Sequence, residues 1–143
     1  MPHDIGHGPF SHAIEHAMPP AAKLGLPQEA AGKDPKRQAS HEDYTLKIIL
    51  GSALTPILEK QYSRFGISPW HIACVMNLSL RERDGFFNDR GVSFRKVLHQ
   101  IISSEMDADR MDYLQRDSYY TGVSYGKFDA NWLLTNLGVY IEK

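Results

Sequence analysis

The feature that most constrains this chain lies at its start. Four of its seven histidines fall between His3 and His16, interleaved with the carboxylates Asp4 and Glu15. Residues 6–9, Gly-His-Gly-Pro, cannot continue a regular helix, because glycine is costly inside one and proline disfavours the helical region for the residue before it. We therefore expect a helix end, a tight turn and a new helix, with polar side chains converging on the turn.

The residue types in this cluster favour metal binding. Imidazole and carboxylate are ligands that suit a borderline or hard divalent cation. The adjacent His3 and Asp4 can supply one nitrogen and one oxygen to such an ion, and His7 is expected on the turn beside them.

Residues 11–16 form the second half of the cluster. Ser11 is expected to cap the new helix. His12, Glu15 and His16 then follow at i, i+3 and i+4, so they share one helix face. Glu15, one turn from His12, could hold that ring in a chosen tautomer, which makes His12 the better candidate for proton transfer.

A second informative block covers residues 103–122. Its polar side chains fall at i, i+4, i+7, i+8 and i+11 and make one stripe of a helix about three turns long. These residues are Asp109, Tyr113, Arg116, Asp117 and Tyr120. One interpretation is a solvated helix with an Asp112–Arg116 pair worth only about 0.3–0.5 kcal/mol. The other is a platform for a sugar or base, because tyrosine rings alternate with charges.

The run from His3 to His12, His-Asp-Ile-Gly-His-Gly-Pro-Phe-Ser-His, closely resembles the motif of the HD-domain metal-dependent phosphohydrolases, in particular their deoxynucleoside triphosphate triphosphohydrolase branch. Residues 103–129 and the pair His41-Glu42 match the same family. The resemblance implies an all-α fold, a fragment of the HD-domain helical bundle. Residues 1–143 would form a single partial HD domain.

The resemblance also implies roles for individual residues. The metal ligands would be His3, Asp4 and Asp109, around Mn, Fe, Mg or Zn. Catalysis and phosphate binding would fall to His7, His12, Glu15 and His41. In the substrate site Arg110 would meet phosphate, Tyr113 would pack on the sugar and Asp117 would accept the sugar 3'-hydroxyl. The implied reaction hydrolyses a deoxynucleoside triphosphate to nucleoside and triphosphate; the residues alone indicate only metal-assisted phosphoester hydrolysis.

The chain also departs from the family pattern. The family takes a further histidine ligand from a helix upstream of His-Asp, whereas His3 is preceded by two residues here. We therefore expect a chain truncated at both ends relative to the family. The alternative function is a non-catalytic HD remnant that serves as an oligomerisation or regulatory partner.

Helix-capping residues, prolines and glycines predict where the remaining helices begin and end. Residues 18–39 are rich in proline and glycine and are expected to form a long surface loop. This loop is either a mobile connector or a lid or interface loop whose bases Lys33, Lys36 and Arg37 attract phosphate. Helices are expected from Ser40, from Thr55-Pro56 to Gly66, from Ser68-Pro69 to about Leu80, from Ser93 onward, and from Asp129 to about Leu137 with Trp132, Leu133 and Leu137 docking it. Residues 81–91 are expected to be a solvated loop.

Two further histidines leave alternatives open. From the sequence alone, His41 at a helix start is more compatible with a surface position than with an active cleft, and the family register reverses this preference. His71 has no carboxylate spaced beside it, so we expect it, with Cys74, to be structural or exposed.

Composition limits the partners. The formal net charge is −1, with sixteen basic and seventeen acidic side chains, so nothing favours a nucleic-acid polymer or an anionic membrane. We expect no membrane span and no signal peptide. The lone Cys74 cannot form an internal disulfide, which favours a reducing, cytoplasmic setting. We expect a homo-oligomer and a nucleotide or other phosphate-ester substrate.

Overall fold

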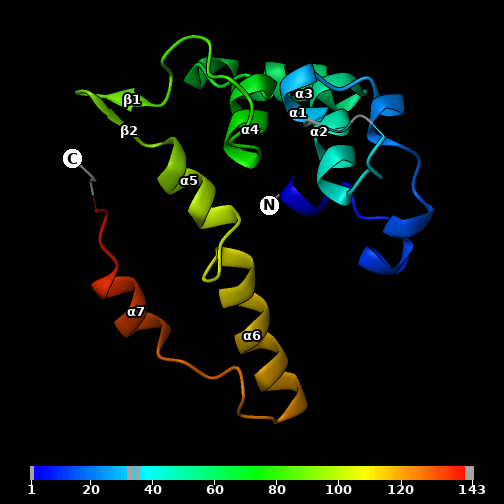
Figure 1. The fold of residues 1–143 in the computed structure, drawn as a ribbon. Coiled ribbons are helices and arrows are strands. Elements are labelled where there is room, and N and C mark those ends of the chain that lie inside the picture. The colour runs from blue at the N-terminus through cyan, green and yellow to red at the C-terminus, as the bar shows by residue number, and fades with distance from the viewer. Residues whose placement is uncertain (1, 32–33, 35, 141–143) are drawn as a thin grey trace. The chain divides into compact units, whose positions relative to one another are not determined.

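The computed structural model describes residues 2–31, 34 and 36–140 of the chain (Figure 1). Helices dominate the described residues, and the strands among them form a single hairpin of two strands with two residues each. The all-α prediction is therefore confirmed. The chain forms two compact units, residues 1–86 and residues 87–143. That the whole chain is one partial HD domain stays a prediction.

The first unit is arranged around helix α2, which contacts α3, α4 and the short helices η1, η2 and η3. In chain order its elements are η1 Pro2–Asp4, η2 Ser11–Ala17, η3 Ala21–Leu24, α1 Gln28–Ala31, α2 His41–Gly51, α3 Leu54–Tyr62, η4 Ser63–Phe65 and α4 Pro69–Met76, where η marks a 3-10 helix. Leu46 and Ile49 of α2 are fully buried, as are Ala73 and Cys74 of α4. Burying a large apolar side chain such as Leu46 or Ile49 contributes about 1.5–3 kcal/mol, so α2 supplies much of this core.

Helix α2 begins where the sequence predicts, at a capping box. The backbone N–H of Ser40 donates to Asp43 Oδ2 at 2.8 Å, and the Ser40 side chain pairs with the N–H at position 43. Arg37 donates to both Asp43 oxygens at 2.7 Å. Burial raises the pKa of Asp43, but the hydrogen bonds from Arg37 and Ser40 outweigh it and hold the pKa below its usual value. Asp43 thus fixes the start of α2 as a buried, ionised cap.

The described part of residues 18–39 contains only the short helices η3 and α1, but it is not a featureless surface loop. Pro20 and Gln38 form an antiparallel bridge that closes it. Ala21, Leu24 and Ala39 make a small buried cluster against Met18, Leu26 and Tyr44. Of the three bases predicted to attract phosphate, Lys33 lies outside the described residues and Arg37 is engaged by Asp43.

Two predicted helix boundaries differ from the structure. Helix α3 begins at Leu54, ahead of the expected cap Thr55, because Thr55 Oγ1 instead accepts from the Ser52 N–H at 3.1 Å and donates to the Ile49 carbonyl at 3.0 Å. The predicted stop at Gly66 is confirmed, since this glycine has a φ of +69°. Helix α4 starts at Pro69 as expected but ends at Met76, earlier than Leu80.

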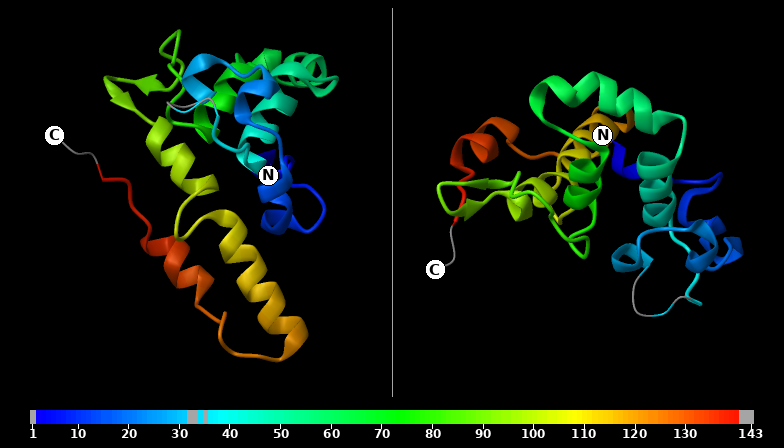
Figure 2. Two further views of the ribbon diagram at one scale, coloured as in Figure 1. Left: turned by 45° about the vertical axis from the view of Figure 1, so that its right-hand side comes forward. Right: turned by 90° about the horizontal axis from the view of Figure 1, so that it is seen from above.

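The second unit consists of the hairpin β1 Asn88–Asp89 with β2 Val92–Ser93, followed by α5 Arg95–Ile102, α6 Ala108–Thr121 and α7 Ala130–Asn136 (Figure 2). The helix expected from Ser93 does not run into the acidic block, because Asp107 caps α6 by accepting from the Arg110 N–H at 2.8 Å. Asp129 caps α7 as predicted. The prediction that Trp132 and Leu137 dock α7 is wrong, because Trp132 is 64% exposed and Leu137 is 58% exposed.

In the part of the chain that the structure describes, every helix is too short or too polar to cross a bilayer.

Candidate active site

The turn that carries the first histidines is fastened to α2 by Thr45. The buried Thr45 Oγ1 donates to the His3 carbonyl at 2.7 Å and accepts from the Gly6 N–H at 3.0 Å. Gly6 allows this approach, because a Cβ at that position would lie 2.0 Å from the His41 carbonyl oxygen. The turn and the start of α2 are thus held together by contacts that only a side chain as small as glycine permits.

His3 and Asp4 lie together at this turn. His3 Nε2 is 3.1 Å from Asp4 Oδ2, a separation that two ligands of one ion can have. His3 Nδ1 is buried and has no hydrogen-bond partner among the residues described. A buried polar atom without a partner is costly, so an imidazole in this state suits metal coordination or its surrounding shell. The two residues fit the metal-ligand role that the sequence predicts.

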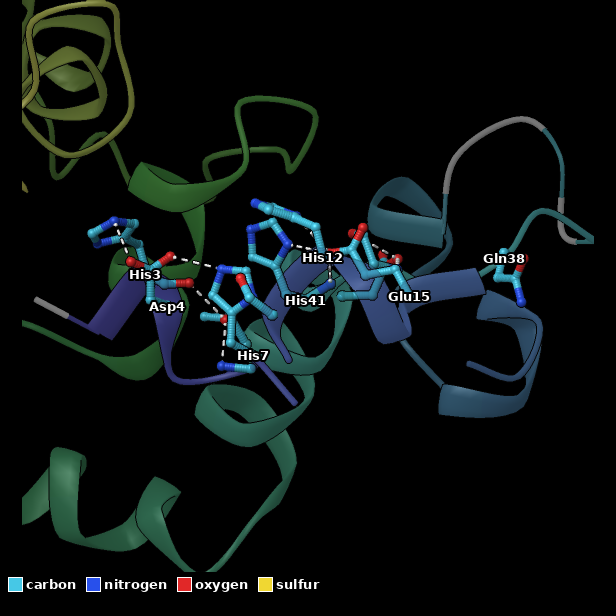
Figure 3. A network of polar contacts seen from close by, with 12 residues as sticks. His3, Asp4, His7, His12, Glu15, Gln38 and His41 are labelled. Carbon is cyan, nitrogen blue, oxygen red and sulfur yellow. Dashed lines mark hydrogen bonds and ion pairs between the residues drawn. The ribbon is translucent and has the colours of Figure 1, made fainter. Parts of the chain in front are cut away.

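Three imidazoles gather beside this pair (Figure 3). The rings of His7 and His41 stack with centroids 3.8 Å apart at an interplanar angle of 11°. His12 meets both edge-on, with centroids 4.9 Å from each. His7 also reaches Asp4, whose Oδ1 is 3.4 Å from its Nε2. Residues from the turn, from η2 and from α2 therefore converge, as the interpretation of His41 as a cleft residue requires.

Glu15 organises two of these rings. Its Oε1 is 2.5 Å from His41 Nδ1 and 3.2 Å from His12 Nδ1, and it also accepts from the His41 backbone N–H at 3.2 Å. The hydrogen bond with the His41 side chain, joined by those from the His41 backbone and from His12, lowers the pKa of Glu15 to about 2. Glu15 is therefore a carboxylate at neutral pH that acts on His12, as predicted, and on His41.

His7 has a different electrostatic environment. Burial lowers the pKa of His7, and the neighbouring His41 lowers it further, whereas Asp4 opposes both. The stacked ring is thus biased toward its neutral form, with a lone pair on one nitrogen. The edge-on His12 is the most exposed member of the cluster, with 70% of its side chain accessible.

One local prediction here is wrong. Ser11 is not a helix cap: it is the first residue of η2, and Phe10 occupies the cap position without a side-chain hydrogen bond. Phe10 and Ser11 both have positive φ, +66° and +52°. This backbone turns the Ser11 hydroxyl toward His7, with Oγ 3.3 Å from Nδ1. His12 and Glu15 still meet at i, i+3, because a 3-10 helix aligns that spacing.

The remaining predicted site residues belong to α6 in the second unit. Asp109, Arg110, Tyr113 and Asp117 all lie on this helix, as expected. Arg110 is exposed and its Nη1 is 3.1 Å from Glu105 Oε2. The Asp112–Arg116 ion pair of the solvated-helix interpretation is present as well. The predicted roles of these residues in metal and substrate binding stay predictions.

Two partnerships were missed from the sequence. Thr45 lies mid-helix, forty-two residues from the carbonyl that it binds, and nothing in its neighbourhood marks it. His71, expected to lack a carboxylate, has Asp84 Oδ2 2.7 Å from its Nε2, thirteen residues along the chain. The charged stretch at 81–91 was the only available signal for that pair.

Comparisons with known proteins agree with the motif at a distance. No family model matches the chain, and no solved structure matches it. The chain is similar to Uncharacterized protein YwfO of Bacillus subtilis, 38% identical over 92% of this chain and 23% of that protein. It is 31% identical to Uncharacterized protein MG461 homolog of Mycoplasma pneumoniae, over 94% of this chain and 26% of that protein.

A third relative has a named activity. Deoxynucleoside triphosphate triphosphohydrolase SAMHD1 of Homo sapiens is 25% identical over 85% of this chain and 19% of that protein. The chain spans about a quarter or less of the length of these relatives. The similarities suggest an HD-domain family.

Proposed function

We propose that this chain is the motif-bearing part of an HD-type metal-dependent phosphohydrolase that hydrolyses deoxynucleoside triphosphates to deoxynucleoside and triphosphate. The observation that carries the proposal is the convergence of His7, His12, His41 and Glu15 beside His3 and Asp4 within one compact unit. The similarity to a deoxynucleoside triphosphate triphosphohydrolase supports the choice of substrate.

In this proposal the divalent ion is held by His3, Asp4 and Asp109. The open nitrogen of His3 and the adjacent Asp4 carboxylate support the first two assignments. Asp109 belongs to the second unit, and its assignment rests on the sequence resemblance. The chemistry that such an ion supplies when bound is polarisation of a phosphoryl oxygen and activation of a water.

In this proposal the three imidazoles bind the phosphate oxygens and transfer a proton. Because Glu15 engages Nδ1 of both His12 and His41, the Nε2 atom of each ring is left for substrate. When both of its nitrogens are protonated, the exposed His12 can keep its Nδ1–H on Glu15 and donate its Nε2 proton to the nucleoside oxygen as the bond between that oxygen and phosphorus breaks. Water supplies the oxygen gained by the triphosphate, so one water is consumed for each deoxynucleoside released. His7 and His41, stacked beside it, can hydrogen-bond the phosphate oxygens.

Residues of α6 would bind the nucleoside half. Arg110 supplies a permanent cation for phosphate, Tyr113 an aromatic face for the sugar, and Asp117 an acceptor for the 3'-hydroxyl. The first assignment requires Arg110 to exchange Glu105 for substrate.

The test is product analysis with each deoxynucleoside triphosphate in the presence of Mn²⁺, Fe²⁺, Mg²⁺ or Zn²⁺. Chromatography should detect deoxynucleoside and intact triphosphate in equal amounts. Asp117→Ala should raise KM more than it lowers kcat, while His12→Ala should lower kcat with metal still bound. Release of orthophosphate or pyrophosphate instead would contradict the proposed reaction.

The alternative, a non-catalytic remnant with an oligomerisation or regulatory role, is favoured by one observation. Helix α7 and its continuation expose Trp132, Leu134, Leu137 and Tyr140, the last at 86%. Metal analysis separates the two functions. Stoichiometric metal that is lost in Asp109→Ala supports the enzyme, whereas a metal-free chain that is indifferent to this change supports the remnant. Oligomeric state, measured by light scattering, tests the predicted homo-oligomer.

A further inference from the structure

We propose that His7, His12, His41 and Glu15 form a second divalent-metal site, separate from the predicted His3–Asp4–Asp109 site and selective for borderline ions such as Zn²⁺. Each of the four residues offers one ligand atom, and these atoms all lie within 4.8 Å of one another. Three imidazoles and one carboxylate form a donor set that suits Zn²⁺ better than Mg²⁺ or Ca²⁺, which prefer oxygen ligands.

The required donor atoms are open. Glu15 uses Oε1 for its contacts with the two rings, and no hydrogen bond reaches Oε2 from the residues that the structure describes. Nε2 of His12 and Nε2 of His41 are equally without a partner among those residues. Glu15, His12 and His41 therefore each keep an atom that can serve as a ligand.

The third imidazole is held only loosely by its neighbours. His7 contacts Ser11 Oγ at 3.3 Å and Asp4 at 3.4 Å, both longer than a strong hydrogen bond. One ring nitrogen can therefore turn to an ion at little cost.

The distances permit closure around one ion. Zn²⁺ binds nitrogen at about 2.0–2.1 Å, which places tetrahedral ligands roughly 3.3 Å apart. The observed limit of 4.8 Å requires movements of about an ångström. His12 can make this movement because 70% of its side chain is exposed. His7 and His41 stack face to face at 3.8 Å, so one of these two rings must rotate before both in-plane lone pairs can reach the same ion.

Such an ion would occupy the groups that the proposed function assigns to phosphate and to proton transfer. Zn²⁺ at this site would therefore block the enzyme, a consequence that rests on the proposed function, whereas the binding itself does not. Inorganic triphosphate and Zn²⁺ should then compete for the cluster.

The experiment is calorimetric titration of the chain with Zn²⁺ alone, with Co²⁺ absorption as a spectroscopic readout of tetrahedral nitrogen ligation. The chain should retain one tight equivalent in Asp109→Asn, which removes a ligand only from the other predicted site. His12→Gln and His41→Gln each remove a ligand and should weaken that equivalent by more than the roughly tenfold to hundredfold loss that removing a ligand's hydrogen-bond partner causes. His16→Gln, an exposed imidazole on the same η2 helix, is the matched control and should bind as the unaltered chain does.

Unchanged affinity in both His12→Gln and His41→Gln would overturn the site, as would loss of all binding in Asp109→Asn. Circular dichroism of each variant distinguishes lost ligation from lost folding, and Glu15→Gln, which keeps shape but removes the carboxylate, gives an independent reading. Zn²⁺ binding without hydrolysis of any deoxynucleoside triphosphate would leave this site standing and reject the proposed function. Hydrolysis of a deoxynucleoside triphosphate, together with an unchanged Zn²⁺ affinity in His12→Gln and His41→Gln, would reject this metal site and leave the proposed function standing.

Discussion

Two histidine–carboxylate pairs in the first unit look alike and do different work. His41 Nδ1 lies 2.5 Å from Glu15, and His71 Nε2 lies 2.7 Å from Asp84. The other nitrogen of His71, Nδ1, accepts from the Ser68 N–H at 3.1 Å, and its ring stacks on Phe86. Both nitrogens of His71 are thus consumed by the fold, whereas His41 keeps Nε2 open to a ligand.

The difference teaches how to distinguish a structural histidine from a chemical one. An imidazole that accepts from a backbone N–H with one nitrogen and pairs with a carboxylate through the other has no ring nitrogen left for a ligand. His71 closes the N-terminal turn of α4 in this way. A carboxylate partner is therefore no evidence of function by itself; the free second nitrogen, together with neighbouring rings, is the informative feature.

The largest expected effect is a loss of turnover when the cluster of His7, His12, His41 and Glu15, here called the open cluster, is altered. Replacing His12 by Gln should lower kcat by about 10²–10⁴-fold, the usual contribution of a general acid. The free energy of unfolding should barely change, because the side chain is mostly exposed. Steady-state kinetics and urea denaturation measure the two quantities. His16→Gln, on the same short helix, should leave kcat and the free energy of unfolding unchanged. Equal losses of kcat in His12→Gln and His16→Gln would show that the open cluster has no special role in turnover.

The next effect concerns the backbone that brings the open cluster together. In Gly6→Ala the new Cβ would lie 2.0 Å from the His41 carbonyl and 2.4 Å from the Thr45 N–H nitrogen. The turn must then move away from α2, at a cost of about 3 kcal/mol, the upper end of the usual range for overpacking. Thermal and urea denaturation measure it. Gly51→Ala is the control, because its Cβ meets only the flexible Lys47 side chain at 3.6 Å.

Removing the locked histidine should damage stability more than chemistry. His71→Ala leaves the Ser68 N–H without its acceptor and empties a buried position, so the free energy of unfolding should fall by about 1–3 kcal/mol. At a temperature where the variant stays folded, its Zn²⁺ affinity and its kcat should match those of the unaltered chain. A specific loss of kcat with full stability would mean that the pair is chemical after all.

The smallest expected effect is the loss of folding stability in acid that comes from the Glu15–His41 pair. Because hydrogen bonds from His41 lower the pKa of Glu15 from 4.5 to about 2 in the folded chain, ionised Glu15 stabilises the fold. That contribution is complete above pH 4.5 and is lost as the pH falls toward 2. Urea denaturation between these limits should show a stability difference between the chain and Glu15→Gln that shrinks with acid. A difference constant with pH would reject the assigned partnership.

Local sequence signals predicted much of the fold because they act within a few residues. The capping box at Ser40, the Ser68-Pro69 start of α4, the Gly66 stop and the Asp129 cap are all confirmed. The failures occurred where a competing contact came from farther away or from unusual backbone. Thr55 is used by Ile49 and Ser52, and Phe10 and Ser11 adopt positive φ.

For the site, the sequence by itself determined which chemical groups are present and that His12 and Glu15 meet, since their spacing is local. Only the tertiary structure decided that Glu15 also binds His41, that His7 stacks on that ring, and that Thr45 holds the turn. These contacts join residues 26, 34 and 42 positions apart. Side chains that far apart meet through the packing of the turn on α2, and no short-range pattern encodes the result.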